Sequence, residues 1–521
     1  MQDQEINHYQ PAVSIHSRKL LLVGKSIFIG AAAGIVVVLY RLLLMEAEKL
    51  SRNAYTYFAG HLKMIPLMFL VLGILGYVIG CLAQKYRAIG GSGIPQVKGI
   101  ISGQYHAPWL STLFAKFFGG AASILAGLSL GREGPSIQLG ACVAQGIGVK
   151  FASSRTEKRM LIAGGASAGL AAAFNAPLAG AMFAVEEVFK YISPLVLLVT
   201  TVSAITADFV SKLVFGMAPV FSFRTTMAFP LNAYWLLLTM GIMLGGAGAL
   251  YNLVLVKTIA LYKKPHWLRA GWRPVLPFLL AGVLALVFPT ALGSGHAVME
   301  ELHPAASIYM LLVLFAVKFL FSMISFGSGA PGGIFFPLLI LGATIGAITG
   351  NIASAWLHVD PALFNNFVIV AMAGYFTAIV RAPITGVVLL LEMTGSFMNL
   401  LPLLVVSLAA YVTADLLKSK PVYDSLLDNL LNSGALAGKK ESKGKITAEF
   451  IVQYGSGAAG QAVKDLHLPK DCLLIAVGRE GRDIIPSGGT VILADDYLVF
   501  LLNLNDEAEY REMLTQMTAV S

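Results

Sequence analysis

The sequence predicts an all-α polytopic membrane protein with an inverted internal repeat and broken helices, followed by a small α+β C-terminal domain. Three observations carry this prediction: an apolar composition, motifs that recur at a fixed offset, and a change of composition near Lys418. Of the 521 residues, 57% are hydrophobic and 12% are charged, and the mean hydropathy is +0.75. Soluble domains carry about 25% charged residues, so the chain is expected to cross a membrane many times.

Charge and cysteine usage argue against several other classes. The 37 Lys and Arg outnumber the 28 Asp and Glu, but the basic residues gather in short loops and tails without base-stacking aromatics between them. This pattern follows the positive-inside rule and does not indicate nucleic-acid binding. Cys81, Cys142 and Cys472 are widely spaced, which indicates neither a disulfide framework nor a zinc site. Because no metal-ligand cluster or nucleophile–base arrangement is visible, an enzyme is not expected.

The polar residues 1–19 lack a signal-peptide layout and are predicted to be a cytosolic tail. Several of the apolar segments that follow are shorter than the ~20 residues of a full crossing and are interrupted by Gly and Pro. Paired broken helices in two halves indicate the central site of a transporter. The segments have approximate cores at 20–44, 64–84, 108–130, 134–149, 160–189, 193–216, 231–260, 274–292, 305–326, 333–357, 366–392 and 398–416.

Residues 64–216 and 274–416 are predicted to be two copies of one repeat. Charged and proline positions that keep a common register are improbable as coincidences, even in a Gly-rich chain. The pairs at an offset of 202 are Ser92 and Ser294, Lys116 and Lys318, Pro135 and Pro337, and Gly140 and Gly342; after a four-residue insertion, the pairs at 206 are Pro177 and Pro383, Gly180 and Gly386, and Glu186 and Glu392.

Loop charge predicts that the two copies cross the membrane in opposite senses. The loop after the first Gly-rich helix carries Lys150, Arg155, Lys158 and Arg159, whereas the equivalent segment 351–366 has no Lys or Arg. By the positive-inside rule, the first loop is cytosolic and the second is external. The repeat is therefore expected to be inverted, with the substrate site at the midplane.

The motif Gly131–Pro135 (GREGP) places two charged residues at membrane depth. Each such charge costs roughly 2.5–3.5 kcal/mol on insertion scales, so these residues are rarely without function. Gly134 and Pro135 break one helix and begin the next, which leaves unpartnered backbone N–H groups beside Glu133. A helix N-terminus directed into the membrane is an anion site.

Two further motifs supply donors without a fixed cation. Gly332–Pro337 (GGIFFP) is the repeat partner of GREGP, and Gly91–Pro95 (GSGIP) adds the Ser92 hydroxyl before a Pro-initiated helix. N–H and O–H donors bind a halide weakly enough to release it. The alternative is that these glycines only permit close helix packing. Three motifs within one repeat favour the anion site.

GSGIP, GREGP and GIFFP resemble the three signature stretches of the CLC family of chloride channels and proton/chloride antiporters, and the resemblance covers about residues 20–425. It implies a homodimer in the cell membrane, with both termini cytoplasmic and one anion pathway per subunit. By the resemblance, the chloride ligands are the Ser92 and Tyr423 side chains and the backbone at Gly134, Ile334 and Phe335. GIFFP departs from the commoner GIFAP, so Phe336 is expected to narrow the pathway.

The resemblance assigns proton transfer to two glutamates. Glu133 matches the gating glutamate, whose carboxylate occupies an anion site when ionised and moves away when protonated; its alternative role is to pair with Arg132. Glu187 falls where antiporters keep an internal proton-transfer glutamate and many channels have an apolar residue; its alternative is a solvated helix end. Glu186 has a repeat counterpart and is interpreted as structural.

These features predict coupled exchange of chloride for protons, with no cofactor and no metal. By the resemblance, Ser92 favours chloride over nitrate and argues against the fluoride-exporting branch of the family. A passive voltage- or ligand-gated chloride channel with the same anion site is the alternative. A cation transporter is disfavoured because the chain has no TVGYG-like filter and no run of acidic membrane residues.

Residues 426–445 are predicted to be a basic linker, and residues 446–521 a small α+β domain that would gain from dimerisation because its core is marginal. Strand patterns lie at 449–453, 472–477, 482–485 and 497–502, with a helix near 506–517. Within it, Gly478–Gly481 repeats the GREG string, but without the following proline and apolar helix it is expected to form a hairpin turn.

This domain resembles the C-terminal subdomain of RCK (regulator of K+ conductance) proteins. Such subdomains dimerise, and several bind small ligands such as cyclic di-AMP at the dimer interface. The hypothesis is a cytosolic sensor with a cyclic dinucleotide near Arg479, Arg482, Ile484, Ile485 and Pro486. A dimerisation module without a ligand is the alternative.

Overall fold

The computed structural model describes residues 9–152, 155–190, 193–221, 223, 227–264, 269–432, 445–469, 472–479, 482–503 and 507–518. The chain divides into two compact units, Met1–Ala435 and Leu436–Ser521, each with its own hydrophobic core. Among the described residues, eight helices are long and apolar enough to cross a membrane. The predicted class, a helical membrane protein with broken helices and a small α+β domain, is confirmed.

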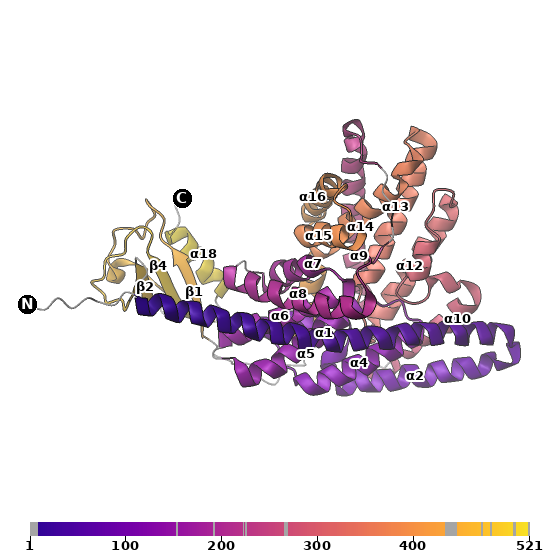
Figure 1. The fold of residues 1–521 in the computed structure, drawn as a ribbon, viewed down its shortest axis with the longest axis horizontal. Coiled ribbons are helices and arrows are strands. Elements are labelled where there is room, and N and C mark those ends of the chain that lie inside the picture. Colours follow the sequence, from indigo (N-terminus) through magenta and orange to yellow (C-terminus); the bar gives the residue numbers. More distant parts are fainter. Residues whose placement is uncertain are drawn as a thin grey trace, which may run out of the picture. The chain divides into compact units, whose positions relative to one another are not determined.

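The described residues of the first half of the membrane unit form helices joined by turns and loops (Figure 1). Its elements are α1 (Tyr9–Gly60), η1 (Leu62–Met64), α2 (Ile65–Lys85), η2 (Arg87–Ile89), α3 (Ile94–Ser102), α4 (Trp109–Leu125), α5 (Glu133–Phe151), α6 (Arg155–Phe174), α7 (Pro177–Phe183), the π-helical turn η3 (Ala184–Phe189) and α8 (Pro194–Phe215).

The second half follows the same order of long and short helices and ends in one additional helix. Its elements are η4 (Leu231–Ala233), α9 (Tyr234–Lys263), η5 (Ala270–Trp272), α10 (Val275–Val287), η6 (Pro289–Ala291), α11 (His296–Glu300), α12 (Ile308–Gly327), α13 (Phe335–Leu357), η7 (Pro361–Leu363), α14 (Phe364–Val380), α15 (Pro383–Thr394), α16 (Leu400–Leu416) and α17 (Val422–Asn432).

Two predicted apolar segments, 160–189 and 366–392, are each divided into two helices. The breaks fall at equivalent positions, because Asn175 and Arg381 both adopt a left-handed backbone conformation, with φ of 53° and 70°. Each is followed two residues later by the proline that begins α7 or α15. A proline cannot continue the preceding helix, since it lacks an N–H and clashes with the previous turn. Of the resulting helices, α7 with 7 residues and α15 with 12 are too short to cross a membrane.

Both ends of the membrane unit are more helical than expected. The helix α1 begins at Tyr9, inside the predicted tail, and α17 runs to Asn432, inside the predicted linker. Residues 433–444 of that linker lie outside the described part of the chain.

Two buried lysines hold equivalent turns of the two halves. Lys116 Nζ donates to the carbonyls of Ile89 and Gly91, at 2.8 and 2.5 Å. The repeat predicts matching contacts 202 positions later, and Lys318 Nζ donates to the carbonyls of Ala291 and Gly293, at 2.9 and 2.7 Å. Residues that are 202 positions apart in the sequence therefore also make equivalent contacts in the structure.

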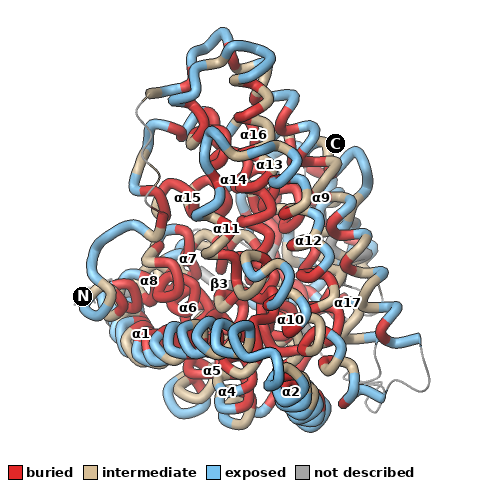
Figure 2. Tube along the Cα trace, turned by 90° about the vertical axis from the view of Figure 1, so that its right-hand side faces the viewer, coloured by how far each residue is buried: buried red, intermediate tan, exposed pale blue. Residues whose placement is uncertain are grey.

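Glycines allow the two central helices to pack closely against their neighbours. A Cβ atom on Gly140 of α5 would overlap the carbonyl of Gly165 on α6, and one on Gly165 would overlap the carbonyl of Gly140. In the second copy, a Cβ on Gly342 of α13 would lie 3.0 Å from the Ala371 carbonyl of α14. These backbone contacts set the positions of α5 and α13 within the buried interior (Figure 2).

The second unit is a four-stranded antiparallel sheet with strand order β1-β4-β2-β3 and one helix. One face of the sheet joins a core that includes Leu474, Val477, Leu498, Phe500 and Leu514. The elements are β1 (Lys445–Ile451), η8 (Val463–Asp465), β2 (Leu473–Arg479), β3 (Arg482–Ile484), β4 (Tyr497–Asn503) and α18 (Glu507–Thr518). The β2–β3 pairing is the expected hairpin, although its turn residues 480 and 481 lie outside the described part.

Candidate functional site

The helices α5 and α13 begin side by side because two equivalent glycines pair with each other. Gly131 and Gly333, which are 202 positions apart, exchange two backbone hydrogen bonds of 2.7 Å each. The first turns of both helices therefore meet at one point. Their first N–H groups have no partner within the helix, so the arrangement concentrates donors there.

The Glu133 carboxylate lies buried at this point, with 1% of the residue exposed. A Cβ on Gly131 would overlap Glu133 Oε2 and would lie 3.1 Å from the backbone nitrogen of Phe336, so the carboxylate and the α13 terminus share one side of this glycine. Arg132 Nε lies 3.9 Å from Glu133 Oε1. That separation is at the outer limit of an ion pair and gives little support to a purely structural Arg132–Glu133 role.

Ser92 is held against the first turn of α5. It lies between two glycines in the left-handed conformation, Gly91 at φ 67° and Gly93 at φ 95°, and its Oγ accepts a hydrogen bond of 3.3 Å from the Ile94 amide. A Cβ on Gly134 would lie 2.7 Å from the Ser92 carbonyl oxygen. The predicted residues Ser92 and Gly134 are therefore neighbours.

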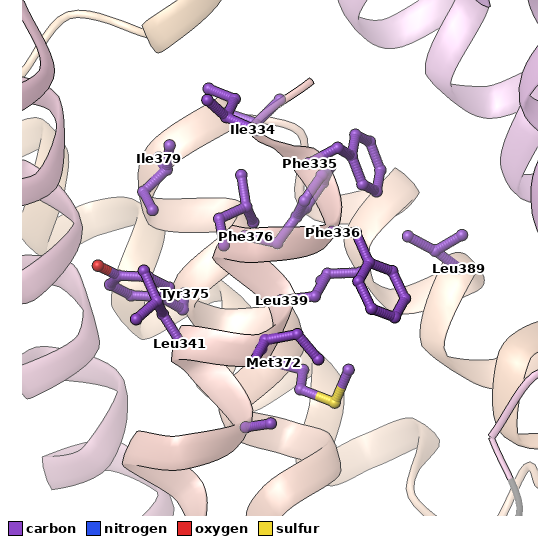
Figure 3. Packing of buried hydrophobic residues seen from close by; sticks show 14 of the residues in the cluster. Ile334, Phe335, Phe336, Leu339, Leu341, Met372, Tyr375, Phe376, Ile379 and Leu389 are labelled. Atoms are coloured by element: carbon purple, nitrogen blue, oxygen red, sulfur yellow. The ribbon is translucent and has the colours of Figure 1, made fainter. Parts of the chain in front are cut away.

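Ile334 and Phe335 form the first turn of α13 and are fully buried (Figure 3). The Phe183 ring lies between Phe335 and Tyr423, with ring centroids 5.9 and 6.3 Å away. The Tyr423 hydroxyl is buried and has no hydrogen-bond partner among the described residues. Because buried hydroxyls are normally satisfied, this donor suits a ligand.

Phe336 points into the hydrophobic cluster beside α13 (Figure 3). Its ring lies 6.4 Å from that of Phe174, 6.0 Å from that of Phe221 and 4.7 Å from that of His296, measured between centroids. The ring of the second phenylalanine of GIFFP is thus packed among aromatic residues, while its backbone nitrogen lies on the side of Gly131 that the Glu133 carboxylate occupies.

Two cavities approach the centre from equivalent turns of the repeat. One of about 230 Å³ is lined by Gly91 and Ser92, by residues of α17 and by three basic residues, Arg87, Lys263 and Arg273. The other, of about 290 Å³, is lined by the turn 293–295 and by Glu48, Arg52 and His296. Sequence analysis did not identify the second cavity, although the equivalence of Ser92 and Ser294 was a signal for it.

Glu187 is buried and hydrogen-bonded, which excludes the solvated helix end. It is 2% exposed, and its Oε1 accepts a hydrogen bond of 2.8 Å from Lys98 Nζ. Lys98 also contacts Asp424, and Lys190 Nζ donates to Asp424 Oδ2 at 2.6 Å. Sequence analysis did not single out Lys98 or Asp424, although a lysine in a short apolar helix and an acid beside Tyr423 were available signals.

Glu186 has the structural contacts that its repeat counterpart suggested. Its carboxylate accepts hydrogen bonds from the amides of Ile384 and Thr385, at 3.3 and 2.8 Å, and from the Thr385 hydroxyl at 2.7 Å. The two consecutive glutamates therefore serve different elements: Glu186 satisfies the first turn of α15, and Glu187 pairs with α3.

In the second unit, Arg479 is engaged in an ion pair. Its Nε and Nη2 donate to the two carboxylate oxygens of Asp496 at 2.8 and 2.7 Å, and Nη2 also donates to the Val491 carbonyl at 2.7 Å. Burial opposes ionisation of Asp496, but these bonds and the Leu493 amide lower its pKa below the ordinary value. This geometry gives Arg479 a structural role that the sequence did not predict.

The other predicted ligand residues lie at the neighbouring strand. Ile484 ends β3, and Ile485 and Pro486 follow it; Ile485 is 89% exposed, whereas Ile484 and Pro486 are partly buried. The backbone of Arg482 pairs with Arg479, but the Arg482 side chain lies outside the described part.

A helical membrane unit whose broken helices meet at buried donors and a buried carboxylate defines a transporter or channel for anions. Residues 75–415 match the family model described as voltage gated chloride channel, and residues 447–515 match that of the TrkA-C domain. The chain belongs to the CLC family of chloride channels and H+/Cl− exchangers, with a C-terminal TrkA-C domain. It is a multi-pass membrane protein and not an enzyme.

Relatives and solved structures agree with this assignment. The chain is 33% identical over 424 residues to the H(+)/Cl(−) exchange transporters ClcA of Salmonella arizonae and of Citrobacter koseri; each alignment covers 77% of this chain and 87% of the relative. It resembles the structure of a slow cyanobacterial Cl−/H+ antiporter with a TM-score of 0.75 and 28% identity, over 79% of this chain and 98% of that one. A eukaryotic CLC transporter matches in fold, with a TM-score of 0.67 and 23% identity, over 79% and 74% of the two chains.

Proposed function

We propose that this protein exchanges chloride for protons across the cell membrane. The carrying observation is the pair of buried carboxylates: Glu133 beside the first turns of α5 and α13, and Glu187 beside Lys98. An uncoupled chloride pathway needs anion donors but no second buried acid. The named relatives are themselves H(+)/Cl(−) exchangers, which favours the same activity here.

Chloride would be bound by donors without a fixed cation. The buried Tyr423 hydroxyl, the Ser92 hydroxyl and the backbone amides of Ile334 and Phe335 are the proposed ligands, with Gly134 allowing Ser92 to approach α5. Helix N-termini attract an anion through partial charges, which is weak enough to permit release. The basic cavity at Ser92 would raise the local chloride concentration.

The Glu133 carboxylate would compete with chloride for the α13 N-terminus. When ionised it has the charge of a halide and lies where the α13 amides can stabilise it. Once protonated, it loses that attraction and would leave the position to an anion. Chloride therefore takes this position only after the carboxylate has taken up a proton, and that proton moves away with the side chain. This exclusion is the proposed basis of exchange.

Protons would reach Glu133 from the cytosol by way of Glu187. The loop after α5 is basic and is assigned to the cytosol, and Glu187 lies in η3, which follows the next two helices of the same copy. Both termini are proposed to lie in the cytoplasm, as the same charge pattern predicts.

A homodimer would cover the short helices α7 and α15. Leu178 and Ile384, in their first turns, are 51% and 48% exposed, and their amides depend on Glu392 and Glu186. Lipid tails cannot satisfy polar backbone groups or nearby carboxylates. A second copy of this chain is therefore the proposed neighbour, with one anion pathway in each subunit.

The test is proton flux in proteoliposomes driven only by a chloride gradient. Uphill proton movement is expected in the wild type and should disappear in Glu133→Gln and Glu187→Gln. Glu300→Gln, which changes an exposed carboxylate, is the matched control and should retain coupled flux. Chloride flux without protons in the wild type would support the alternative, a passive channel.

The C-terminal domain is proposed to be a dimeric sensor of a small cytosolic ligand such as cyclic di-AMP. Support comes from the TrkA-C match and from exposed apolar side chains: Leu473 of β2 and Tyr497 of β4 are 59% and 52% exposed, and Ile485, which follows β3, is 89% exposed. Calorimetric titration of a 440–521 fragment with nucleotides tests whether the domain binds such a ligand. Dimerisation without saturable nucleotide binding would support the alternative, a dimerisation module that binds no ligand.

A further inference from the structure

A compact cluster of four charges lies around Glu187. Lys98 on α3 contacts both Glu187 and Asp424, and Lys190, which follows η3, donates to the second oxygen of Asp424. Lys98 and Glu187 are buried, with side-chain exposures of 9% and 2%, whereas Asp424 is 31% and Lys190 43% exposed. The cluster thus extends from a buried end at Glu187 to an accessible end at Lys190.

The charges of this cluster balance only while Glu187 is ionised. Two ammonium groups then face two carboxylates, and the hydrogen bond from Lys98 stabilises the charged form of Glu187. When Glu187 takes up a proton, Asp424 still holds Lys98 in place. The cluster is then left with one excess positive charge. At this depth such a charge is poorly screened.

The excess charge would act on the chloride site because Asp424 follows Tyr423 directly in α17. The aromatic ring of Tyr423 reaches Phe183, whose helix α7 runs straight into η3 and Glu187. The groups that face Glu187 from the packed elements are Lys98 of α3, Tyr423 and Asp424 of α17, and Lys190. Proton loading at Glu187 and chloride binding at Tyr423 therefore share one electrostatic environment.

We propose that Lys98 is a positioning residue that makes proton loading of Glu187 and chloride occupancy beside Tyr423 favour each other. This rests on the proposed exchange function. Lys98 neither binds chloride nor carries the transported proton; it keeps the ionised Glu187 in place and supplies the uncompensated charge after protonation. Asp424 keeps Lys98 at this position. Because Lys98 contacts both Asp424 and Glu187, its ammonium group stabilises each of the two carboxylates less than it would stabilise one alone.

The test compares Lys98→Met, Lys98→Arg and Asp424→Asn in full-length protein in proteoliposomes. Chloride-driven proton flux is measured against internal pH and against internal chloride concentration. Without the ammonium, Glu187 is protonated more readily, so Lys98→Met should move the midpoint of the pH profile upward by about one unit, a tenfold change in proton affinity. It should also raise the half-saturating chloride concentration several-fold.

The two other variants give results that a general loss of stability would not produce. Lys98→Arg, which retains the charge, should restore most of both properties. In Asp424→Asn, Glu187 is the remaining carboxylate of the cluster that pairs with Lys98, so its ionised form is stabilised more strongly. The pH midpoint should therefore move downward, opposite to the shift in Lys98→Met. Asp424→Asn also supplies the test should Lys98→Met not fold. Lys25→Met, which removes a lysine paired with Glu157 at 2.6 Å, is the matched control for loss of an ion pair.

Unchanged pH and chloride dependence in Lys98→Met, or shifts of the same sign in Lys98→Met and Asp424→Asn, would overturn the role of Lys98 while wild-type exchange remained. A wild type that moves chloride without protons would instead overturn the exchange function, and this proposal with it.

Discussion

Glu186 and Glu392 cap the broken helices of each other's repeat. Glu186 accepts hydrogen bonds from the first amides of α15, and Glu392 accepts them from the first amides of α7, at 3.0 Å from Leu178 and 2.7 Å from Ala179. The two carboxylates are 206 positions apart, and so are the amides that they bind. A reciprocal exchange of this kind is the mark of a two-fold relation between the copies.

Removing either cap should destabilise the membrane unit without uncoupling transport. In Glu392→Ala, two amides at the start of α7 lose their acceptor, and each unsatisfied group costs about 1–3 kcal/mol. We expect a lower melting temperature in detergent and an unchanged ratio of protons to chloride in proteoliposomes. Glu186→Ala should behave similarly. A melting temperature equal to that of the wild type would contradict this assignment.

Lys116→Met should weaken chloride binding more than Lys318→Met. Lys116 holds the carbonyls of the turn that presents Ser92, and hydrogen bonds to charged groups contribute about 1.5–3 kcal/mol each. Lys318 holds the equivalent turn at Ser294, which is not a proposed ligand, and is the matched control. Calorimetric titration with chloride measures the difference. Equal losses of affinity would show that the Ser92 turn has no special role.

Phe336→Ala should increase chloride turnover several-fold with the coupling retained. The backbone nitrogen of Phe336 lies near Glu133 and its ring packs on Phe174 and His296, so removal of the ring should open space next to the pathway, while the backbone donors of Ile334 and Phe335 stay in place. The truncation should also destabilise the protein by about 3–5 kcal/mol. Phe221→Ala, which removes a ring that packs on Phe336, controls for general loosening. Equal acceleration in both variants would argue against a specific constriction.

The TrkA-C domain should lose stability in acid through Asp496. Its pKa in the folded domain is lowered, so its contribution to stability is complete above the unfolded value of about 3.9 and is lost as pH falls through the folded value. Thermal unfolding of residues 436–521 at pH 7 and pH 3 measures this contribution. In Asp496→Asn the difference between the two pH values should shrink. An unchanged difference would place the acid sensitivity elsewhere.

Cys472 should report unfolding of the same domain. It is buried, and burial raises the pKa of its thiol to about 11. Since the thiolate is the reactive form, alkylation at pH 8 should be slow in the folded domain and fast in denaturant. Cys472 is the single cysteine of residues 436–521, so mass spectrometry of the fragment gives the rate directly. Equally fast alkylation of the folded domain would contradict the packing.

The sequence predicted those features of the fold and site that are repeated or local. The offset of 202 anticipated the matched contacts of Lys116 and Lys318, because repeated turns need repeated donors. The GREGP and GIFFP motifs anticipated helix termini that meet, since glycine and proline specify where a helix begins. The breaks at Asn175 and Arg381 were missed, although Pro177 and Pro383 were visible signals.

The sequence could not reveal features of the site that depart from the repeat, or contacts between strands that are distant along the chain. The position equivalent to Lys98 is Glu300, of opposite charge, and Asp424 lies in a helix with no counterpart. Comparison of the two copies therefore could not identify the cluster at Glu187. The resemblance placed Arg479 near a ligand. Its pairing with Asp496 could not be predicted because it depends on the β2–β4 register, in which Gly478 lies opposite Tyr497.

The glycine contacts of α5 and α13 have a consequence for the distribution of damaging mutations. Gly140 and Gly342 lie about two turns into their helices, away from the residues proposed to bind chloride, yet each allows a backbone contact that positions the whole helix. An added methyl group there would displace both first turns from their common meeting point. Inactivating substitutions in a random screen should therefore also fall on small residues distant from the ion path, in matched pairs 202 positions apart.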